Sequence, residues 1–342
     1  MEFVYEYGMF VAKTLTIVLA VLVIVVGIIL SIVRNKEERQ EHIEVKKLND
    51  KYDDITHSMK SIILNKDGIK KLEKEHKAKL KAEKKASQDE EKQRIYVVDF
   101  DGDIKASAVS NLREEITAIL MVARKQDEVF VRLQSPGGMV NTYGLAASQL
   151  TRIKDKDINL TISVDKVAAS GGYMMACVAD KIIAAPFAIL GSIGVVAQIP
   201  NFNRLLKKHD VDYEMITAGE YKRTLTMFGE NTDQARSKFK DDIEDIHVLF
   251  KDFVSQHRPI VDIVKVSTGE FWFGTRAKDL ELVDELQTSD DYLLGKVKEA
   301  DLFSVKHVEK KNLGDKFSGF LQNVSDKVIT GWWSKSRENS LS

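Results

Sequence analysis

The sequence predicts an α/β fold with a mostly parallel sheet, preceded by a membrane-spanning helix and a charged helical extension. Three observations predict it: an uncharged apolar run near the N-terminus, a Lys/Glu-rich stretch after it, and then short β-type runs that alternate with helical patterns. Strands that alternate with helices of this length form right-handed β–α–β crossovers and join in a parallel sheet. The 342 residues provide enough length for a sizeable core and for additional segments.

The first element is the uncharged apolar run from Thr14 to Val33. A helix of about 20 apolar residues crosses the roughly 30 Å of bilayer hydrocarbon. A cleaved signal peptide has a shorter apolar stretch and a small-residue cleavage site, whereas this run continues into SIVRNKEER. We therefore predict that residues 1–33 form a retained membrane anchor with a single span.

Residues 34–92 are rich in Lys and Glu and nearly free of aromatic residues, which is typical of an exposed helical extension. Apolar residues recur in it at spacings of four and three, namely Leu48, Tyr52, Ile55, Met59 and Ile62. That pattern is a short heptad stripe on a charged helix. The stripe is predicted to pack on a second copy or on the main domain, and a solvated linker is the simpler alternative.

Residues 93–303 are predicted to form the α/β domain. Its β-type runs are RIYVVDF, EVFVRLQ, LTISVDK and KIIAAP, and helical patterns such as SNLREEITAILMVARK and VNTYGLAASQLTRIKD lie between them. The stretch 182–199 also lacks charges and is a second candidate for a membrane span. Pro186, Gly191 and Gly194 interrupt it, and such breakers favour short buried strands joined by turns.

Residues 304–342 are predicted to form an amphipathic C-terminal tail. Its apolar residues fall on one helical face, namely Phe317, Phe320, Leu321, Val324, Val328, Ile329 and Trp332. A face of this kind binds either a membrane interface or the surface of the main domain, and both alternatives stay open.

The composition excludes several classes of function. A net charge of −1 provides no general attraction to nucleic acids. The single cysteine, Cys177, excludes an internal disulfide and a site with several cysteine ligands. The seven histidines show no HExxH spacing, so a zinc site is not expected. We therefore expect neither a metal nor a nucleotide cofactor.

Ser170 is the candidate nucleophile. It stands in DKVAASGGYM, between the β-type run LTISV and the helical run GGYMMACVAD, where a helix N-cap is the simpler role for a serine. The turn SPGG, residues 135–138, follows another strand, and its glycines let the backbone approach a ligand closely. The N–H groups of Gly137 or Gly138, together with that of Gly171, are suited to stabilise an oxyanion.

Lys222 is the candidate base for this serine. It stands in TAGEYKRT, after the strand-like run VDYEMIT at residues 211–217. A lysine accepts a proton only when it is neutral, which burial in an apolar pocket permits near neutral pH. Ser192, in the turn LGSIGV, is a candidate to orient Lys222 by a hydrogen bond. From spacing alone, a solvated surface lysine is the simpler interpretation.

The motifs SPGG, AASGGY, GSIGV and GEYK, in this order, resemble those of the SppA/SohB-type bacterial serine–lysine peptidases. The resemblance covers nearly the whole chain. It implies that Ser170 is the nucleophile, that Lys222 is the base, and that Ser192 is the auxiliary serine bonded to the lysine. It implies further that a glycine of the SPGG turn, with Gly138 the better candidate, holds the oxyanion, and the N–H of Gly171 at the start of the next helix is the expected second donor. The fold it implies is the Clp protease/crotonase-like spiral superfold, whose members often form homo-oligomers.

Two details of the sequence bear on this resemblance. Glu281 stands where the family usually has a glycine before Leu-Val-Asp, which puts the turn there in doubt. A second span at 182–199 would place Ser170 and Lys222 on opposite sides of the membrane, where they cannot share a proton. We therefore keep one span.

The expected function is that of a membrane-anchored serine endopeptidase that cleaves hydrophobic or signal-peptide-like segments. Its expected partners are peptide or protein substrates, the membrane and further copies of the chain, with no nucleic acid. Two alternatives stay open: a non-proteolytic oligomeric membrane scaffold, and a crotonase-like enzyme acting on acyl thioesters.

The expected location is the bacterial inner membrane, and the side on which the domain lies is open. The flank after the span carries an excess of basic residues, namely Arg34, Lys36, Arg39, Lys46 and Lys47. By the positive-inside rule, this excess places the domain in the cytoplasm. The family resemblance implies the periplasmic side instead.

Overall fold

The computed structural model describes residues 2–36, 42–65, 67–70, 74, 78 and 92–308. It divides into two units, residues 1–42 with 308–342 and residues 43–307. In the first unit, helix α1 runs from Glu2 to Lys36. Among the described residues, its stretch Tyr7–Ile24 is the one helical segment long and apolar enough to span a membrane. The predicted tail beyond Val308 and most of the charged run after Lys70 lie outside the described residues.

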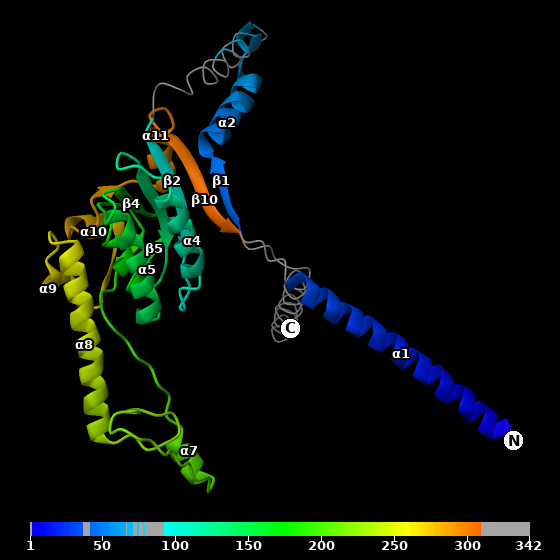
Figure 1. Ribbon diagram of the computed structural model, residues 1–342. Helices are drawn as coiled ribbons and strands as arrows, with labels where there is room; N and C mark the ends of the chain where they lie inside the picture. Colours follow the sequence, from blue (N-terminus) through cyan, green and yellow to red (C-terminus); the bar gives the residue numbers. More distant parts are fainter. Residues whose placement is uncertain are drawn as a thin grey trace, which may run out of the picture. The chain divides into compact units, whose positions relative to one another are not determined.

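The main sheet of the described chain has seven strands in the order β1-β10-β2-β3-β4-β6-β9 (Figure 1). All the strand pairs from β10 to β9 are parallel, as the alternation of strands and helices predicted. The strands are β1 (His42–Lys47), β2 (Arg94–Asp101), β3 (Glu128–Gln134), β4 (Asn159–Val164), β6 (Lys181–Ala184), β9 (Glu285–Leu286) and β10 (Asp301–Val308).

A second, smaller sheet holds β5 (Val167–Ala169), β7 (Ile189–Gly191) and β8 (Phe271–Phe273). β5 and β7 are parallel, and β7 and β8 are antiparallel. A β-bridge from Ser135 to Ala168 joins this sheet to the end of β3. The chain thus passes from the large sheet to the small sheet and then into a helix, as in β4, β5 and α6 (Gly171–Ala176). This β–β–α pattern confirms the predicted spiral superfold, and it places 182–199 in short strands and loops.

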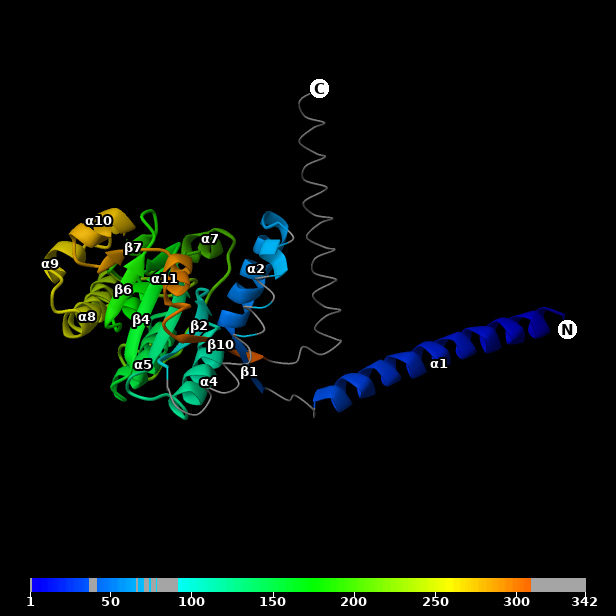
Figure 2. The same cartoon turned by 90° about the horizontal axis from the view of Figure 1, so that it is seen from above.

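Helices cover both faces of the main sheet (Figure 2). Residues alternate along β2, so that Tyr96, Val98 and Phe100 contact one cluster and Ile95 and Val97 contact the other. The larger cluster packs under α4 (Val109–Leu120) and α5 (Val140–Lys154). The smaller one packs under α2 (Leu48–Ile63) and α11 (Ser289–Lys296).

The apolar stripe of the extension is divided between these environments. Leu48 and Tyr52 of α2 pack on the smaller cluster, whereas Ile55, Met59 and Ile62 are exposed. β1 belongs to the main sheet, so this part of the extension is continuous with the α/β core.

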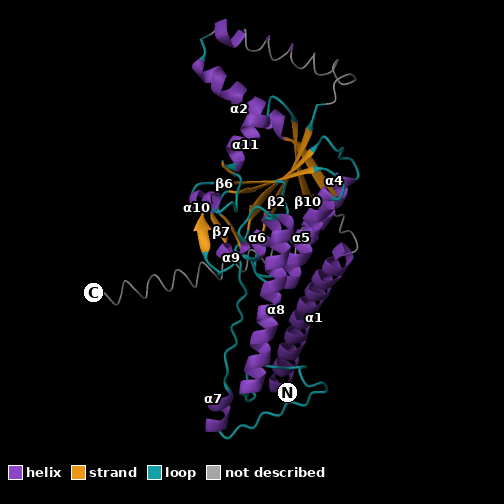
Figure 3. Cartoon of the chain, turned by 90° about the vertical axis from the view of Figure 1, so that its left-hand side faces the viewer, coloured by secondary structure: helices purple, strands orange, loops and turns teal. Residues whose placement is uncertain are grey.

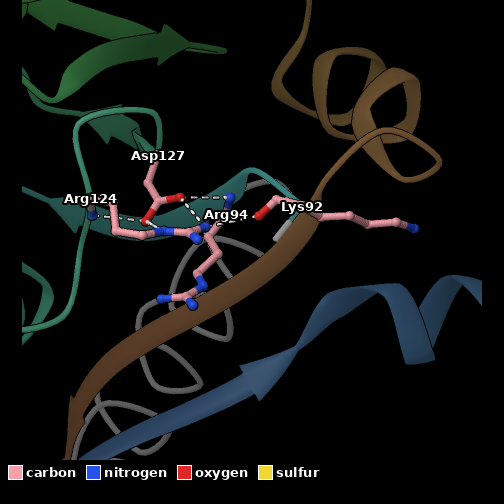
Figure 4. A network of polar contacts seen from close by, with 4 residues as sticks. All are labelled: Lys92, Arg94, Arg124 and Asp127. Atoms are coloured by element: carbon pink, nitrogen blue, oxygen red, sulfur yellow. Dashed lines mark hydrogen bonds and ion pairs between the residues drawn. The ribbon is translucent and has the colours of Figure 1, made fainter. Parts of the chain in front are cut away.

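A buried carboxylate joins the start of β2 to the turn before β3 (Figure 4). Asp127 is fully buried and pairs with the Arg124 guanidinium at 2.9 Å. It also accepts the Arg94 backbone N–H at 3.1 Å, and Arg124 reaches the Lys92 carbonyl at 2.9 Å. These contacts fix the N-terminal end of β2, which is the end that pairs with the parallel strand β10.

A long arm follows the small sheet. It contains α7 (Asn203–Lys208) and a loop over 209–232, and α8 (Asp233–His257) leads back to the core. Figures 1 and 3 show α7 and the loop beside the N-terminal end of α8, at the end remote from the sheets. α9 (Ile263–Val266) and α10 (Gly274–Asp279) complete the domain. The predicted strand at 211–217 is wrong, because that segment runs through the exposed loop and belongs to neither sheet of the described residues.

Candidate active site

Ser170 occupies a strained turn between β5 and α6, with φ 52° and ψ −120°. Its N–H donates to the Gly191 carbonyl at 2.7 Å, and its carbonyl accepts the Met174 N–H at 3.0 Å. Its side chain makes no capping hydrogen bond to the helix that follows. The N-cap alternative therefore does not describe this serine, and its hydroxyl stays available for chemistry.

The turn 135–139 leaves one backbone donor free beside Ser170. The N–H of Gly137 donates to Ser135 Oγ at 3.1 Å, and that of Met139 donates to the Ile104 carbonyl at 2.9 Å. Pro136 has no N–H, and the N–H of Gly138 has no hydrogen-bond partner among the described residues. Gly138 is exposed and lines the pockets that Ser170 also lines, so its free N–H is accessible to a ligand oxygen there.

Gly171 supplies a second free donor. It is the first residue of α6, where N–H groups have no partner within the helix. A Cβ at Gly171 would lie 2.4 Å from Cγ of Tyr143, and one at Gly138 would lie 2.1 Å from the Ile104 carbonyl oxygen. Both positions therefore require glycine, because the backbone itself lies against its neighbours.

Ser170 borders two pockets. One is a small cavity of about 70 Å³ whose apolar lining includes Val140, Met174, Ile246 and Phe250. The other, of about 530 Å³, is more polar, and its lining includes Ser192, His247 and Thr268. Gly138 and Ser170 line both of them. A peptide whose carbonyl lay at Ser170 would thus border both the apolar recess and the wider groove.

Ser192 lines this second pocket together with Ser170. It follows β7 with φ 51°, and its N–H donates to the Glu270 carbonyl at 2.6 Å. The short sheet therefore carries both serines, because β5 ends just before Ser170 and β7 just before Ser192.

Lys222 is not brought to these residues within one chain. It is exposed in the loop 209–232, and its N–H donates to the Gly219 carbonyl at 3.2 Å. The neighbouring Tyr221 ring lies 5.7 Å from Lys238 Nζ on α8. Lys238 precedes the pocket residue Ile246 by about two helical turns, or roughly 12 Å. The structure thus gathers Ser170, Ser192, Gly138 and Gly171, with Lys222 outside the group.

Helix α8, which was not predicted from the sequence, contributes Ile246, His247 and Phe250 to the pockets. Its signals are the Thr232 N-cap, which accepts the Ala235 N–H, and apolar residues spaced by three and four. His247 Nε2 is buried without a hydrogen-bond partner among the described residues.

The remaining chemistry of the described chain is limited. The described residues contain no group of three or more His, Cys, Asp or Glu side chains that would hold a metal. Cys177 is fully buried, and this burial raises the pKa of its thiol well above the ordinary value. It is therefore an unreactive core residue.

Comparisons with known proteins identify the family of the chain. The models of Peptidase family S49 N-terminal and Peptidase family S49 match residues 2–150 and 152–302. The chain is 52% identical to Probable protease SohB of Haemophilus influenzae, with 94% of each chain covered. It is 55% identical to Probable protease SohB of Buchnera aphidicola subsp. Acyrthosiphon pisum, over 70% of this chain and 71% of that one.

Two solved structures are also similar. Both are variants of 1510-N membrane-bound stomatin-specific protease, one with a serine and one with a lysine replaced by alanine, the latter in complex with a substrate peptide. Their TM-scores are 0.40 and 0.42, with 15% and 14% identity; they cover 60% and 68% of this chain, and 86% and 99% of their own chains. The 52% identity to the Haemophilus protein extends over 94% of the chain, so it favours the expected peptidase over its two alternatives. The chain belongs to peptidase family S49 and is a peptidase.

Proposed function

We propose that the protein is a membrane-anchored serine endopeptidase in which Ser170 is the nucleophile and Lys222 of a neighbouring copy is the base. The observation that carries this proposal is the position of Ser170. Its hydroxyl makes no capping bond, and the free N–H groups of Gly138 and Gly171 flank it in one pocket. This is the arrangement that acyl transfer to a serine requires.

In the proposed reaction, Ser170 Oγ attacks the peptide carbonyl while the neutral Lys222 amine takes the hydroxyl proton. The oxyanion that forms accepts the N–H groups of Gly138 and Gly171. Lys222 then returns the proton to the leaving amine, and the C–N bond breaks to leave an acyl-serine. A water molecule, deprotonated by the same lysine, releases the carboxylate product and restores Ser170. Ser192 orients the lysine through its hydroxyl.

The exposed arm supports the assignment of Lys222 to a neighbouring copy. Several of its apolar side chains face solvent, with exposed fractions of 95% for Ile216 and 52% for Leu205. Exposed apolar surface of this extent marks an interaction site. If the arm of one copy packed on a second copy, the contact would bury the apolar side chains of the arm and would bring its Lys222 to the Ser170 pocket of the second copy. Within one chain, neither of the two pockets at Ser170 is lined by a lysine.

The small pocket supports the proposal that the substrates are apolar peptide segments. The lining of this pocket includes the apolar side chains of Val140, Met174, Ile246 and Phe250. We therefore assign the pocket to an apolar residue of the substrate. With α1 as an inner-membrane anchor, the proposed substrates are hydrophobic segments such as released signal peptides. The family resemblance suggests the same class of peptide.

The test is complementation between two inactive variants of the full chain in detergent. Ser170→Ala and Lys222→Ala, each inactive alone on a fluorogenic apolar peptide, are co-expressed with different affinity tags and purified through both. Random pairing would regenerate about a quarter of the wild-type sites, since each site takes its serine from one copy and its lysine from another.

The matched control co-expresses Ser170→Ala with the double variant Ser170→Ala/Lys222→Ala, a pair that cannot form a complete site. Recovery in the test pair and none in the control would support the proposal. Two inactive single variants with no recovery would show that the lysine acts within its own chain. Full activity in both single variants would overturn the dyad.

A further inference from the structure

A chain of hydrogen bonds lies directly under the turn that carries Gly138. The Gly137 N–H donates to Ser135 Oγ at 3.1 Å, Ser135 Oγ lies 2.6 Å from the Tyr143 hydroxyl, and that hydroxyl donates to the Asp103 carbonyl at 2.8 Å. A carbonyl only accepts, so the single hydroxyl proton of Tyr143 goes to Asp103. Ser135 must then donate its own proton to Tyr143. The chain therefore runs in one direction, from Gly137 through Ser135 and Tyr143 to Asp103.

Every member of this chain has its hydrogen-bond partner, and Gly137, Ser135 and Tyr143 are buried, whereas Asp103 at the far end is exposed. Ser135 and Tyr143 have no exposed surface. Burial raises the pKa of the Tyr143 hydroxyl, which keeps it protonated and able to donate. Buried polar networks of this kind hold their members in one geometry when all bonds are made. A hydroxyl deleted from the network would leave a neighbouring group without its partner.

The same tyrosine also contacts the second oxyanion donor. Its ring packs against Gly171, where even a single added carbon would lie 2.4 Å from Cγ. Its hydroxyl end, through Ser135, fixes the Gly137 peptide that precedes Gly138. The Tyr143 side chain thus contacts Gly171 directly and the peptide before Gly138 through Ser135. Neither Ser135 nor Tyr143 itself lines the pockets at Ser170.

We propose that Ser135 and Tyr143 are positioning residues that hold the Gly138 and Gly171 N–H groups in place for the oxyanion, an inference that rests on the proposed serine mechanism. By binding the Gly137 N–H, Ser135 also keeps that donor turned away from the pocket, so that Gly138 provides the N–H on this side. The pair acts on the transition state, because its effect passes through donors that meet the charged oxygen.

The experiment compares Tyr143→Phe and Ser135→Ala with wild type in the detergent-solubilised full chain. Tyr143→Phe keeps the ring against Gly171 and removes the hydroxyl. We expect kcat to fall about ten-fold or more in each variant with KM changed less than about two-fold, since the complete loss of an oxyanion donor costs roughly 100- to 1000-fold. A peptide aldehyde forms an adduct with Ser170 that places an oxyanion in the same position. Its dissociation constant should therefore rise by a similar factor, about ten-fold or more, in each variant.

The matched control is Tyr292→Phe. Tyr292 donates to Glu128 at 2.7 Å and belongs to the smaller cluster, so the same atom is removed on the other face of the sheet. It should leave kcat and aldehyde affinity close to wild type. A double variant, Ser135→Ala/Tyr143→Phe, should lose little more than either single variant, because both act through one chain.

The outcomes separate this inference from the proposed function. If wild type cleaves peptides and binds the aldehyde but both variants keep wild-type kcat and aldehyde affinity, the positioning role is wrong and the serine mechanism stands. If Ser170→Ala keeps full activity, or the wild type does not bind the aldehyde, the serine mechanism itself fails and the inference fails with it. Should Tyr143→Phe not fold, Ser135→Ala alone decides, since it tests the other half of the same chain.

Discussion

The backbone N–H of Ser170 donates to the carbonyl of Gly191 at 2.7 Å, and this bond joins the turn that carries the proposed nucleophile to the neighbouring strand. β5 and β7 pair in parallel up to Ala169 and Gly191, so the bond continues the ladder by one residue. It holds Ser170 at φ 52° and ψ −120°, a conformation that L-residues rarely adopt. Strain of this kind costs about 1–3 kcal/mol and is typical of functional sites.

We predict that Ser170→Gly is more stable than Ser170→Ala by about 1 kcal/mol, although both are inactive. Alanine keeps the Cβ and therefore the strain, whereas glycine removes it at some cost in the entropy of the unfolded chain. Thermal unfolding of the two variants in the same detergent provides the comparison. A glycine variant less stable than the alanine variant would show that the turn stores no strain.

The apolar pocket predicts a change in specificity for Met174→Ala. Met174 lines the small cavity beside Ser170, so its truncation enlarges the recess. The ratio of kcat/KM for leucine over alanine at the substrate residue that enters it should rise about ten-fold, because one or two methylenes are worth roughly 1–3 kcal/mol. The next residue, Met175, is fully buried and does not line the pocket, so Met175→Ala should leave the ratio unchanged. An equal shift in both variants would refute the pocket assignment.

The main sheet and the serine turn follow from local sequence signals. The run EVFVRLQ predicts β3 with its observed bounds of Glu128–Gln134, because alternation and β-branched residues mark a buried strand. Ser170 falls between β5 and α6, where the glycines predict a tight turn. These features depend on residues that are neighbours in sequence.

The position of Lys222 has no such local signal. Its distance from Ser170 depends on how far α8 carries the arm from the sheets. The strand expected at 211–217 failed for a related reason. The segment has a β-type composition, but it lies in the exposed loop and joins neither described sheet. Whether such a segment forms a strand depends on its tertiary context.

A departure from the family pattern leads to another prediction. Glu281 has φ 59°, so it keeps the left-handed conformation that a glycine would supply at this turn. Its carbonyl accepts Arg258 Nε at 2.7 Å, a bond that involves no side-chain atom of Glu281. Glu281→Gly should therefore raise stability by about 0.5–1 kcal/mol, since the left-handed conformation costs a residue with a Cβ about 1–2 kcal/mol. The unfolding midpoint measures this, and a lower midpoint would mean that the glutamate side chain stabilises the turn.

The buried Asp127 carboxylate predicts a pH-dependent contribution to stability. Burial by itself raises the pKa of Asp127, but the hydrogen bonds from Arg124 and Arg94 and the Arg124 charge outweigh it and leave the pKa lowered. A carboxyl whose pKa is lower in the folded state stabilises the fold above its unfolded pKa of about 3.9 and loses that effect as the pH falls through the folded value.

Asp127→Asn should therefore cost about 2–4 kcal/mol at pH 7, where it removes the buried carboxylate charge that pairs with the Arg124 guanidinium. The difference from wild type should narrow below about pH 4, as the wild-type carboxylate becomes protonated. Unfolding midpoints at pH 7, 5 and 3.5 follow this change. The control Asp157→Asn breaks the exposed pair with Lys125 and should shift the midpoint much less, because solvent screens that pair. A difference for Asp127→Asn that stays constant across this pH range would show that the carboxylate charge does not stabilise the junction of β2 and β3.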